Sequence, residues 1–423
     1  MRITILNGNP DPGYATFDTY LHRLVETLSP GHQLTLLNLR SMDIQYCNGC
    51  FGCWVKQPGE CIVPDDSRDM RRAVMHADFV LLASPLRMGF LSAVLKRALD
   101  RFIPLIHPYF AVVEAEAHHR ARYDSYPRLG LLLEQGPDAD DEDVAITTAI
   151  LQRTALNFKS GLEWALLTTA PVEQVAQAIL TPAQPLVLPA APNPLPGEPG
   201  APPRALTVFN GSPRGKGSNT RLLLEQFLQG FESVAGNRHD LFYLNHTAES
   251  GHFAEAFAAA EAVLLAFPLY TDAMPGLVKA FIETLEPFCG RPNNPPLGFM
   301  VQSGFPESAH SRYVERYLRK LAARLGCRYL GTVVKGGCEG VHVMPEQMNR
   351  KLFVALQRAG ESLAQGGRLD PALLRSLARP EHYPRWSAPL FKFFARTKLA
   401  NFYWDGQLRE NGVYEQRFAR PYE

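Results

Sequence analysis

The sequence has no uninterrupted run of about 18 apolar residues, so it predicts no membrane-spanning helix. It also lacks an excess of either charge, because 43 Lys and Arg residues stand against 42 Asp and Glu residues in a chain of 423. That balance argues against a broad basic surface for nucleic acid and against a general attraction to anionic lipid. The N-terminal strand-like run lacks the regions of a signal peptide. We therefore expect a cytoplasmic protein with no nucleic-acid partner and no membrane partner.

Cysteine is scarce outside one short segment. Of the seven cysteines, four lie within fifteen residues and the other three are scattered through the second half. The clustered cysteines are Cys47, Cys50, Cys53 and Cys61. In a reducing compartment, so tight a cluster indicates metal or redox chemistry more than a framework of disulfides.

Proline, in contrast, is concentrated in one stretch. Residues 182–203 contain nine prolines in 22 positions, a density that no helix or central strand tolerates, so we expect an extended linker there. The linker separates a domain of residues 1–181 from a domain of residues 204–365. Residues 366–423 form a C-terminal extension rich in aromatic and basic side chains, which we expect to pack against the second domain or a partner subunit.

The two halves of the chain resemble each other at three places. The paired segments are residues 2–10 with 205–213, 77–85 with 260–268, and 129–133 with 297–301. The second pair is identical at six of nine positions, and in both halves a Lys and an acidic residue follow its proline at the same steps. An extra segment, residues 44–63, occurs in the first half only and contains the four clustered cysteines. These matches indicate two copies of one unit.

Within each copy, short continuous apolar runs alternate with stretches of helical periodicity. Runs that are buried on both faces are typical of parallel strands, and strands that alternate with helices predict a doubly wound sheet. The ligands of such sheets bind beyond the carboxyl ends of the strands. We therefore predict the α/β class, with two tandem doubly wound parallel-sheet domains whose sites lie in the turns that follow the strands.

The turn after the first strand of the second copy, residues 210–220, has the composition of an anion site. Its glycines allow the backbone to bend close to a ligand, and Ser218, Asn219 and Thr220 offer side-chain donors and N–H groups at the start of a helix. Arg214 and Lys216 add positive charge. This composition predicts a phosphate site; the alternative is an ordinary capped helix start.

Followed by residues 268–279, this turn resembles the NADPH-dependent FMN reductase family of flavodoxin-like proteins. The resemblance implies flavodoxin-like domains and an FMN site with three walls in the second one. The phosphate would be held by Ser212, Arg214, Ser218, Asn219 and Thr220, and the isoalloxazine ring would be edged by Pro268, Leu269, Tyr270, Thr271 and Asp272. The candidate third wall after the next strand is Gln302, Ser303 and Gly304, and its counterpart in the first copy is Glu134, Gln135 and Gly136.

The first copy departs from this pattern. Its turn, residues 7–17, has no basic residue, and Asp11 is unfavourable beside a phosphate. The turn is similar to the quinone-reductase branch of flavodoxin-like enzymes. That similarity implies an FMN site with Asn9, Thr16 and Phe17 at the phosphate and Pro85, Leu86, Arg87, Met88 and Gly89 beside the ring. The alternative is a sheet that has kept its shape and lost its cofactor.

Three thiolates at three-residue steps, with a fourth further on, can enclose one cluster. The stretch is similar to the iron–sulfur flavoprotein branch of the same family, which implies Cys47, Cys50, Cys53 and Cys61 as ligands of a [4Fe–4S] cluster. Two alternatives stay open. The same thiolates could bind zinc, or they could be free thiols packed over the flavin site with Trp54 as an apolar lid.

The resemblance implies an FMN-dependent NAD(P)H oxidoreductase. Hydride would pass from NAD(P)H to flavin N5, and electrons would then pass to a quinone, a nitro compound, a free flavin or a protein acceptor. No catalytic side chain is predicted, because the cofactor carries the chemistry. The resemblance is compatible with a homo-oligomer. The alternatives are an iron–sulfur and flavin electron carrier without small-molecule turnover, and a scaffold that has lost its cofactors.

Overall fold

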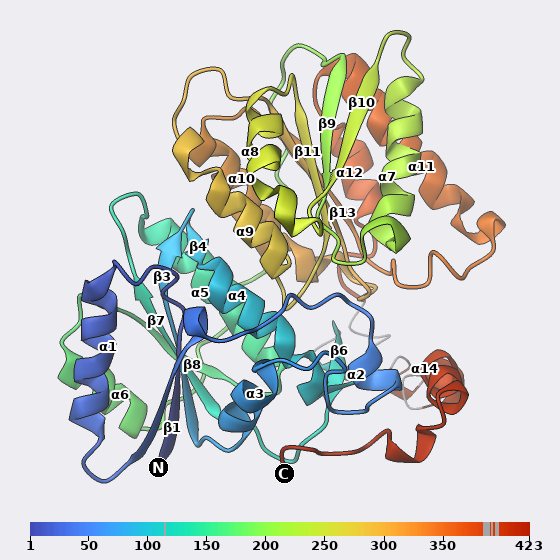
Figure 1. Cartoon of the computed structure of the whole chain (residues 1–423). Helices are drawn as coiled ribbons and strands as arrows, with labels where there is room; N and C mark the ends of the chain where they lie inside the picture. Colours follow the sequence, from blue (N-terminus) through green and yellow to red (C-terminus); the bar gives the residue numbers. More distant parts are fainter. Residues whose placement is uncertain (114–115, 384–389, 391, 394–396) are drawn as a thin grey trace. The chain divides into compact units, whose positions relative to one another are not determined.

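The computed structural model describes residues 1–113, 116–383, 390, 392–393 and 397–423 (Figure 1). The chain forms two compact units. The first unit comprises residues 1–189 and the described residues from 390 onward, and the second unit comprises residues 190–383. Each unit has a parallel sheet with helices on both faces, so the prediction of two tandem doubly wound α/β domains is confirmed. No helix within the described residues combines the length and apolar character needed to cross a membrane.

The sheet of the first unit has the strand order β2-β1-β3-β7-β8, with all neighbours parallel. Its strands are β1 (Arg2–Asn7), β2 (Gln33–Asn38), β3 (Phe79–Arg87), β7 (Arg128–Glu134) and β8 (Leu162–Leu167). The short β4 (Phe90–Leu91) pairs antiparallel with β3, while β5 (Ile106–Val113) and β6 (Glu116–Ala121) form a separate hairpin.

The helices of the first unit cover both faces of this sheet. They are α1 (Ala15–Leu28), α3 (Ser67–Met75), α4 (Ala93–Leu99), α5 (Asp141–Asn157) and α6 (Val172–Leu180). The short α2 (Gly52–Val55) lies in the segment of the clustered cysteines. Helices α1 and α6 pack on one face, where Leu24 and Val175 share a core with Ile5 and Leu81. Helices α3, α4 and α5 lie on the opposite side (Figure 1).

The second unit repeats this plan with the strand order β10-β9-β11-β12-β13. Its strands are β9 (Ala205–Asn210), β10 (Arg238–Tyr243), β11 (Val263–Pro268), β12 (Leu297–Gln302) and β13 (Tyr329–Lys335). Its helices are α7 (Asn219–Glu232), α8 (Ser250–Ala258), α9 (Gly276–Thr284), α10 (Arg312–Leu325), α11 (Glu346–Gly366) and α12 (Pro371–Leu377). Helices α7, α11 and α12 share one core with the sheet, and α8 to α10 cover its other face (Figure 1).

Helices α7 and α11 approach each other closely through two glycines. A Cβ atom on Gly230 would lie 1.8 Å from the carbonyl oxygen of Gln357, and one on Gly360 would lie 1.9 Å from that of Phe227. Any side chain at either position would push the helices apart, because backbone atoms cannot yield as side chains can. This contact positions α7, whose N-terminus forms part of the candidate site.

The proline-rich segment has no helix and no strand over residues 182–203. Its two ends are attached to different units. Leu186 N donates to Leu162 O at 2.8 Å in the first unit, and Glu198 N donates to Tyr329 O at 2.7 Å in the second. The segment is therefore extended, and it is anchored at both ends by backbone hydrogen bonds.

The C-terminal extension differs from our expectation. Its described residues from 390 onward, which include α14 (Lys398–Glu410), belong to the first unit. The Tyr109 hydroxyl donates to Asp405 Oδ1 at 2.8 Å, and Arg71 Nε donates to the Tyr422 hydroxyl at 2.9 Å. Packing of these residues on the second domain was therefore the wrong prediction. Residues far apart in the sequence make these contacts, so the aromatic composition alone could not name the surface they cover.

Arg122 holds this tail from inside the first unit. Its side chain is 1% exposed, and Nη1 donates to the carbonyl oxygens of Arg417 and Ala419 at 3.3 and 2.9 Å. Replacing it with Met leaves buried carbonyl groups without a donor, at a cost of about 1–3 kcal/mol for each such group. We expect Arg122→Met to lower the urea midpoint of unfolding and to open the tail to limited proteolysis. Arg420→Met removes two ion pairs with the exposed carboxylates of Asp124 and Glu423 and is the control. Equal protease sensitivity of the two variants would contradict this role.

Candidate functional site

The turn between β9 and α7, residues 210–220, lies at the carboxyl end of the second sheet; we name it the phosphate turn. Ser218 is the N-cap of α7, and its Oγ accepts a hydrogen bond from Arg221 N at 3.1 Å. The side chains of Ser212, Ser218, Asn219 and Thr220 are at most 4% exposed. The capped helix start that formed the alternative interpretation is therefore present, but Ser218 alone accounts for it.

Two backbone N–H groups at the start of α7 remain available to a ligand. In the described part of the chain, the N–H groups of Asn219 and Thr220 donate no hydrogen bond. They belong to a helix of 14 residues, whose dipole favours an anion at this end. Arg214 and Lys216 add two positive charges to the turn. The chemistry of this donor set fits the phosphate group of FMN.

The segment after β13 crosses the phosphate turn and contributes two residues that the sequence analysis missed. Both terminal nitrogens of Arg214 lie 3.3 Å from Glu339 Oε1. Asn219 Nδ2 donates to Glu339 O at 3.2 Å, and Asn219 Oδ1 lies 3.1 Å from His342 Nδ1. Glu339 thus takes the guanidinium that a phosphate would use. The glycine-rich run of residues 336–340 was the available signal, because it follows a strand at the edge where ligands bind.

The loop after β11, residues 268–274, has the same unusual backbone as its counterpart in the first unit; we name it the ring loop. Thr271 and Asp272 have φ angles of +42° and +60°, and Met88 and Gly89 have +50° and +74°. Residues other than glycine rarely adopt this left-handed conformation, which surrounding structure must maintain and which is common at functional sites. The two copies of the unit therefore share one turn geometry at the predicted edge of the ring.

The end of β12 connects the ring loop to the phosphate turn. Leu269 N donates to Gln302 O at 2.7 Å, and Gln302 Nε2 donates to Thr220 Oγ1 at 3.3 Å. A Cβ atom on Gly304 would meet a single heavy atom within 4 Å, the Cβ of Glu339 at 3.6 Å. The other residues predicted for these walls are buried or half-buried at the same edge: Pro268, Tyr270 and Ser303. The structure thus brings the three predicted walls together.

The corresponding turn of the first unit is closed by a carboxylate. Asp18, in the first turn of α1, accepts hydrogen bonds from Asn7 Nδ2 at 2.8 Å, Asn9 Nδ2 at 3.1 Å and Arg40 Nη2 at 2.7 Å. Burial opposes ionisation of Asp18, but the hydrogen bonds from Arg40, Asn7 and Asn9 outweigh it, so the pKa of this carboxyl lies below its usual value. These three side-chain donors are engaged with a carboxylate that would repel a phosphate, so the side chains present do not fit one.

The remaining residues predicted for an FMN site in the first unit lie around this turn and the loop after β3. Thr16 is exposed at the start of α1, and Phe17 is fully buried in the core between α1 and the sheet. The predicted ring-edge residues are buried or half-buried at the carboxyl end of β3: Pro85, Leu86, Arg87, Met88 and Gly89. The turn at the predicted ring edge therefore has the same form in both units, whereas the turns after β1 and β9 differ.

The cysteine loop, residues 44–63, contains α2 and no disulfide, since all seven cysteines are free thiols. Three of its sulfurs each accept a hydrogen bond from the backbone N–H two residues further on: Cys47 from Gly49, Cys50 from Gly52 at 3.4 Å, and Cys61 from Val63 at 3.5 Å. Hydrogen bonds to sulfur are one of the means by which proteins tune iron–sulfur clusters.

The structure does not draw the four sulfurs into one coordination site. Among the described residues, no three His, Cys, Asp or Glu side chains are grouped so that they could hold a metal ion. Burial raises the pKa of the Cys47 thiol to about 12, and burial together with Cys47, Cys61 and Cys50 raises the pKa of Cys53. Four thiols are the right type and number of ligands for a metal bound by thiolates. The loop must bring the four sulfurs closer together to bind such a metal.

Two buried arginines stand beside the cysteine loop. Arg101 Nη2 donates to Cys61 Sγ at 3.3 Å and lies 2.9 Å from Asp65 Oδ2. The charge of Arg122 favours the thiolate form of Cys53, and its guanidinium donates to backbone carbonyl groups among the described residues. These two cations would offset the negative charge of bound thiolates.

Trp54, which one alternative assigned to a lid, is buried against other aromatic residues. Its ring stacks on Phe51 with centroids 5.0 Å apart and meets the edge of Trp404 at 5.4 Å. Its Nε1 donates to Ile106 O at 2.9 Å. The C-terminal extension therefore covers this side of the cysteine loop.

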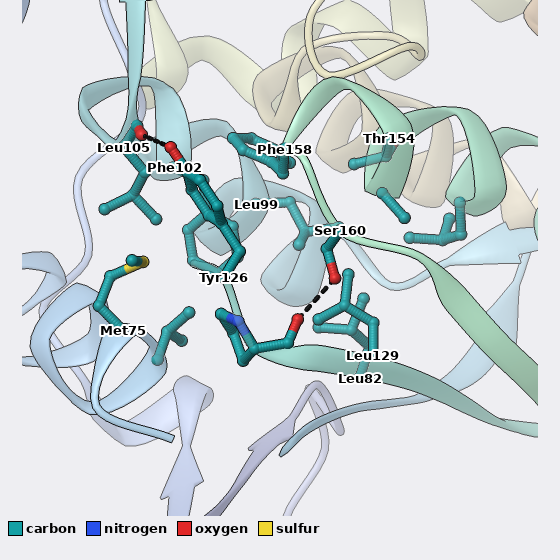
Figure 2. A pocket seen from close by; sticks show the side chains of 14 residues that line it. Met75, Leu82, Leu99, Phe102, Leu105, Tyr126, Leu129, Thr154, Phe158 and Ser160 are labelled. Carbon is teal, nitrogen blue, oxygen red and sulfur yellow. Dashed lines mark hydrogen bonds between the residues drawn. The ribbon is translucent and has the colours of Figure 1, made fainter. Parts of the chain in front are cut away.

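A small cavity in the first unit does not belong to the candidate site (Figure 2). Its volume is about 30 Å³, the share of one water molecule in the liquid, whereas cofactor sites measure hundreds of cubic ångströms. Apolar side chains such as Leu99 and Phe158 line it, and the hydroxyls of Tyr126 and Ser160 donate to backbone carbonyl groups at 2.7 and 2.5 Å. The cavity is a packing defect of the core.

Comparison with known proteins identifies the family. Residues 1–124 and 205–336, together more than half of the chain, match the family described as NADPH-dependent FMN reductase. The chain belongs to this family. It contains the family's unit twice, in tandem, as the internal repeat predicted.

Curated relatives and solved structures resemble parts of the chain. An iron–sulfur flavoprotein of Archaeoglobus fulgidus is 36% identical over 84 residues, which are 20% of this chain and 37% of that protein. One of Methanocaldococcus jannaschii is 30% identical over 105 residues, or 25% of this chain and 53% of that protein. The chain thus spans about half or less of these two relatives. An apo NADH:FMN oxidoreductase structure is 19% identical, covers 42% of this chain and 97% of its own, and has a TM-score of 0.31.

Proposed function

We propose that this protein is an FMN-dependent oxidoreductase that takes hydride from NADH or NADPH and delivers electrons to a quinone, a nitro compound, a free flavin or a protein. The observation that carries the proposal is the pair of available N–H groups on Asn219 and Thr220 beside Arg214. Membership of the NADPH-dependent FMN reductase family supports FMN as the cofactor.

In this proposal the residues of the second unit bind and orient, and none of them carries out the redox step. Ser212 and Arg214 would bind the phosphate together with the N–H groups of Asn219 and Thr220. Flavin, when bound, supplies a hydride acceptor. The ring loop would lie along the edge of the ring, and its left-handed turn is already formed before the cofactor binds.

We further propose that Cys47, Cys50, Cys53 and Cys61 hold a [4Fe–4S] cluster. The support is the thiol count, the N–H donors to three of the sulfurs, the neighbouring arginines, and the iron–sulfur flavoproteins among the relatives. A cluster of this kind supplies one-electron transfer. Zinc and free thiols are the competing outcomes of metal analysis.

The proposed activity is tested by anaerobic stopped-flow mixing of the FMN-loaded protein with NADH or NADPH. We expect the flavin absorbance to bleach on the timescale of enzymatic turnover, because nicotinamide hydride reduces the flavin directly. The cysteine loop favours a second candidate, an electron carrier that is reduced by another protein. A flavin that is not bleached by either nicotinamide would contradict the reductase and support the carrier.

Glu339→Gln is expected to tighten FMN binding about fivefold. Glu339 and Arg214 are each partly exposed, and such ion pairs are worth up to about 1 kcal/mol, which a phosphate must overcome to reach the guanidinium. Fluorescence titration with FMN measures the change. Glu346→Gln, which removes an exposed carboxylate at the start of α11, is the control and should bind FMN as the parent does. Weaker binding by Glu339→Gln would show that the carboxylate supports the site instead of competing with its ligand.

A further inference from the structure

The two turns can be compared position by position. Both begin with an Asn-Gly pair at residues 7 and 210, and in this register the buried positions of α1 and α7 coincide. The coinciding residues are Phe17, Leu21, Leu24 and Leu28 in the first unit and Thr220, Leu224, Phe227 and Phe231 in the second. The same register places Asp11 at the position of Arg214 and Asp18 at the position of Arg221.

A third acidic residue follows from the pairing of the strands. Glu134, at the end of β7, pairs with Pro85, and Gln302, at the end of β12, pairs with Pro268. The first unit therefore has an acid at three places where the second has Arg, Arg and Gln. The Glu134 carboxyl also takes part in a hydrogen bond with the Tyr14 side chain. A phosphate entering the first turn would meet several carboxylates.

Side-chain donors around the first turn are moreover occupied by the protein. Asn7 Nδ2, Asn9 Nδ2 and Arg40 all bind Asp18, and Arg40 Nη1 also donates to Asn9 O at 3.3 Å. Asp11 Oδ1 accepts the N–H of Gly13 at 2.7 Å. The Arg40–Asp18 pair is largely buried, with side chains 21% and 14% exposed, so it does not open without cost.

We infer that each chain holds one FMN, in the second unit, and that the first unit is closed to a nucleotide phosphate by the carboxylate of Asp18. The inference rests on the proposed function of the second unit. It assigns the two copies different tasks: the second copy holds the flavin, and the first copy provides the frame for the cysteine loop.

The test is the number of FMN molecules bound per full-length chain at saturation, measured by calorimetric titration and by ultrafiltration. One per chain is expected. Two per chain would overturn the inference and leave the proposed function intact. None would overturn the proposed function itself, and the count of one with it.

A negative charge introduced into the phosphate turn tests which unit holds the flavin. Gly217 suits this purpose, because a Cβ atom there meets no atom within 4 Å. Gly217→Glu is expected to bind no FMN at concentrations that saturate the parent. Gly366→Glu, which adds the same charge at the end of α11, where a Cβ atom also meets no atom within 4 Å, is the control and should keep one FMN. One FMN retained by Gly217→Glu, in protein whose circular dichroism and unfolding temperature match those of Gly366→Glu, would overturn the assignment to the second unit.

Discussion

Replacing Arg214 with Glu is expected to weaken FMN binding by about a hundredfold or more. A charge-assisted hydrogen bond is worth about 1.5–3 kcal/mol, and each 1.4 kcal/mol corresponds to about tenfold in the dissociation constant. The new carboxylate would add repulsion at the phosphate, and it would stand beside Glu339, which now pairs with Arg214. The measurement is the dissociation constant from fluorescence titration, supported by flavin retention on gel filtration.

Arg238→Glu is the matched control for this prediction. It makes the same change of charge at the exposed first residue of β10, at the opposite end of the strands from the phosphate turn. The control should bind FMN as tightly as the parent. If Arg214→Glu also bound FMN as the parent does, the phosphate turn would not be the binding site.

Replacing Cys50 with Ser is expected to remove the iron bound by the first unit and the broad visible absorbance of an iron–sulfur cluster. An iron–sulfur cluster is held by cysteine thiolates, and losing one ligand usually loses the cluster. Cys50 is exposed, so the change leaves the core intact. Metal analysis and the anaerobic absorbance spectrum measure the effect, and the FMN content should stay at the level of the parent.

Cys289→Ser is the control, because Cys289 is an exposed thiol of the second unit. It should keep the full iron content. If metal analysis found zinc in the parent protein and none in Cys50→Ser, the four cysteines would be assigned to a zinc site and not to an iron–sulfur cluster. The parent protein can also be reconstituted anaerobically with iron and sulfide. If it then held no metal, the four cysteines would be free thiols, and the proposal of an iron–sulfur cluster would be contradicted.

The fold could be predicted from the sequence because the chain contains the same unit twice. Each strand that the apolar runs predicted has a counterpart at the matching place, and the turn at Met88 and Gly89 reappears at Thr271 and Asp272. The composition of the phosphate turn could also be recognised in the sequence, since its glycines, hydroxyls and charges are contiguous.

The residues that were missed come from distant parts of the chain. Glu339 lies 125 positions from Arg214, and Asp405 lies 296 positions from Tyr109, so the fold alone brings each pair together. Asp18 directly follows the turn of residues 7–17, but its role depends on Arg40, which reaches it from beyond β2. Local pattern therefore predicted the frame and the composition of the phosphate turn, while long-range contacts bring Glu339 to Arg214 and Arg40 to Asp18.

The most direct test of this account is a crystal structure of the full-length protein grown with saturating FMN. We expect the phosphate to accept hydrogen bonds from the N–H groups of Asn219 and Thr220 and from Arg214, with the Glu339 carboxylate moved away from the guanidinium. A phosphate turn without ligand, with Glu339 still bound to Arg214, would contradict the account.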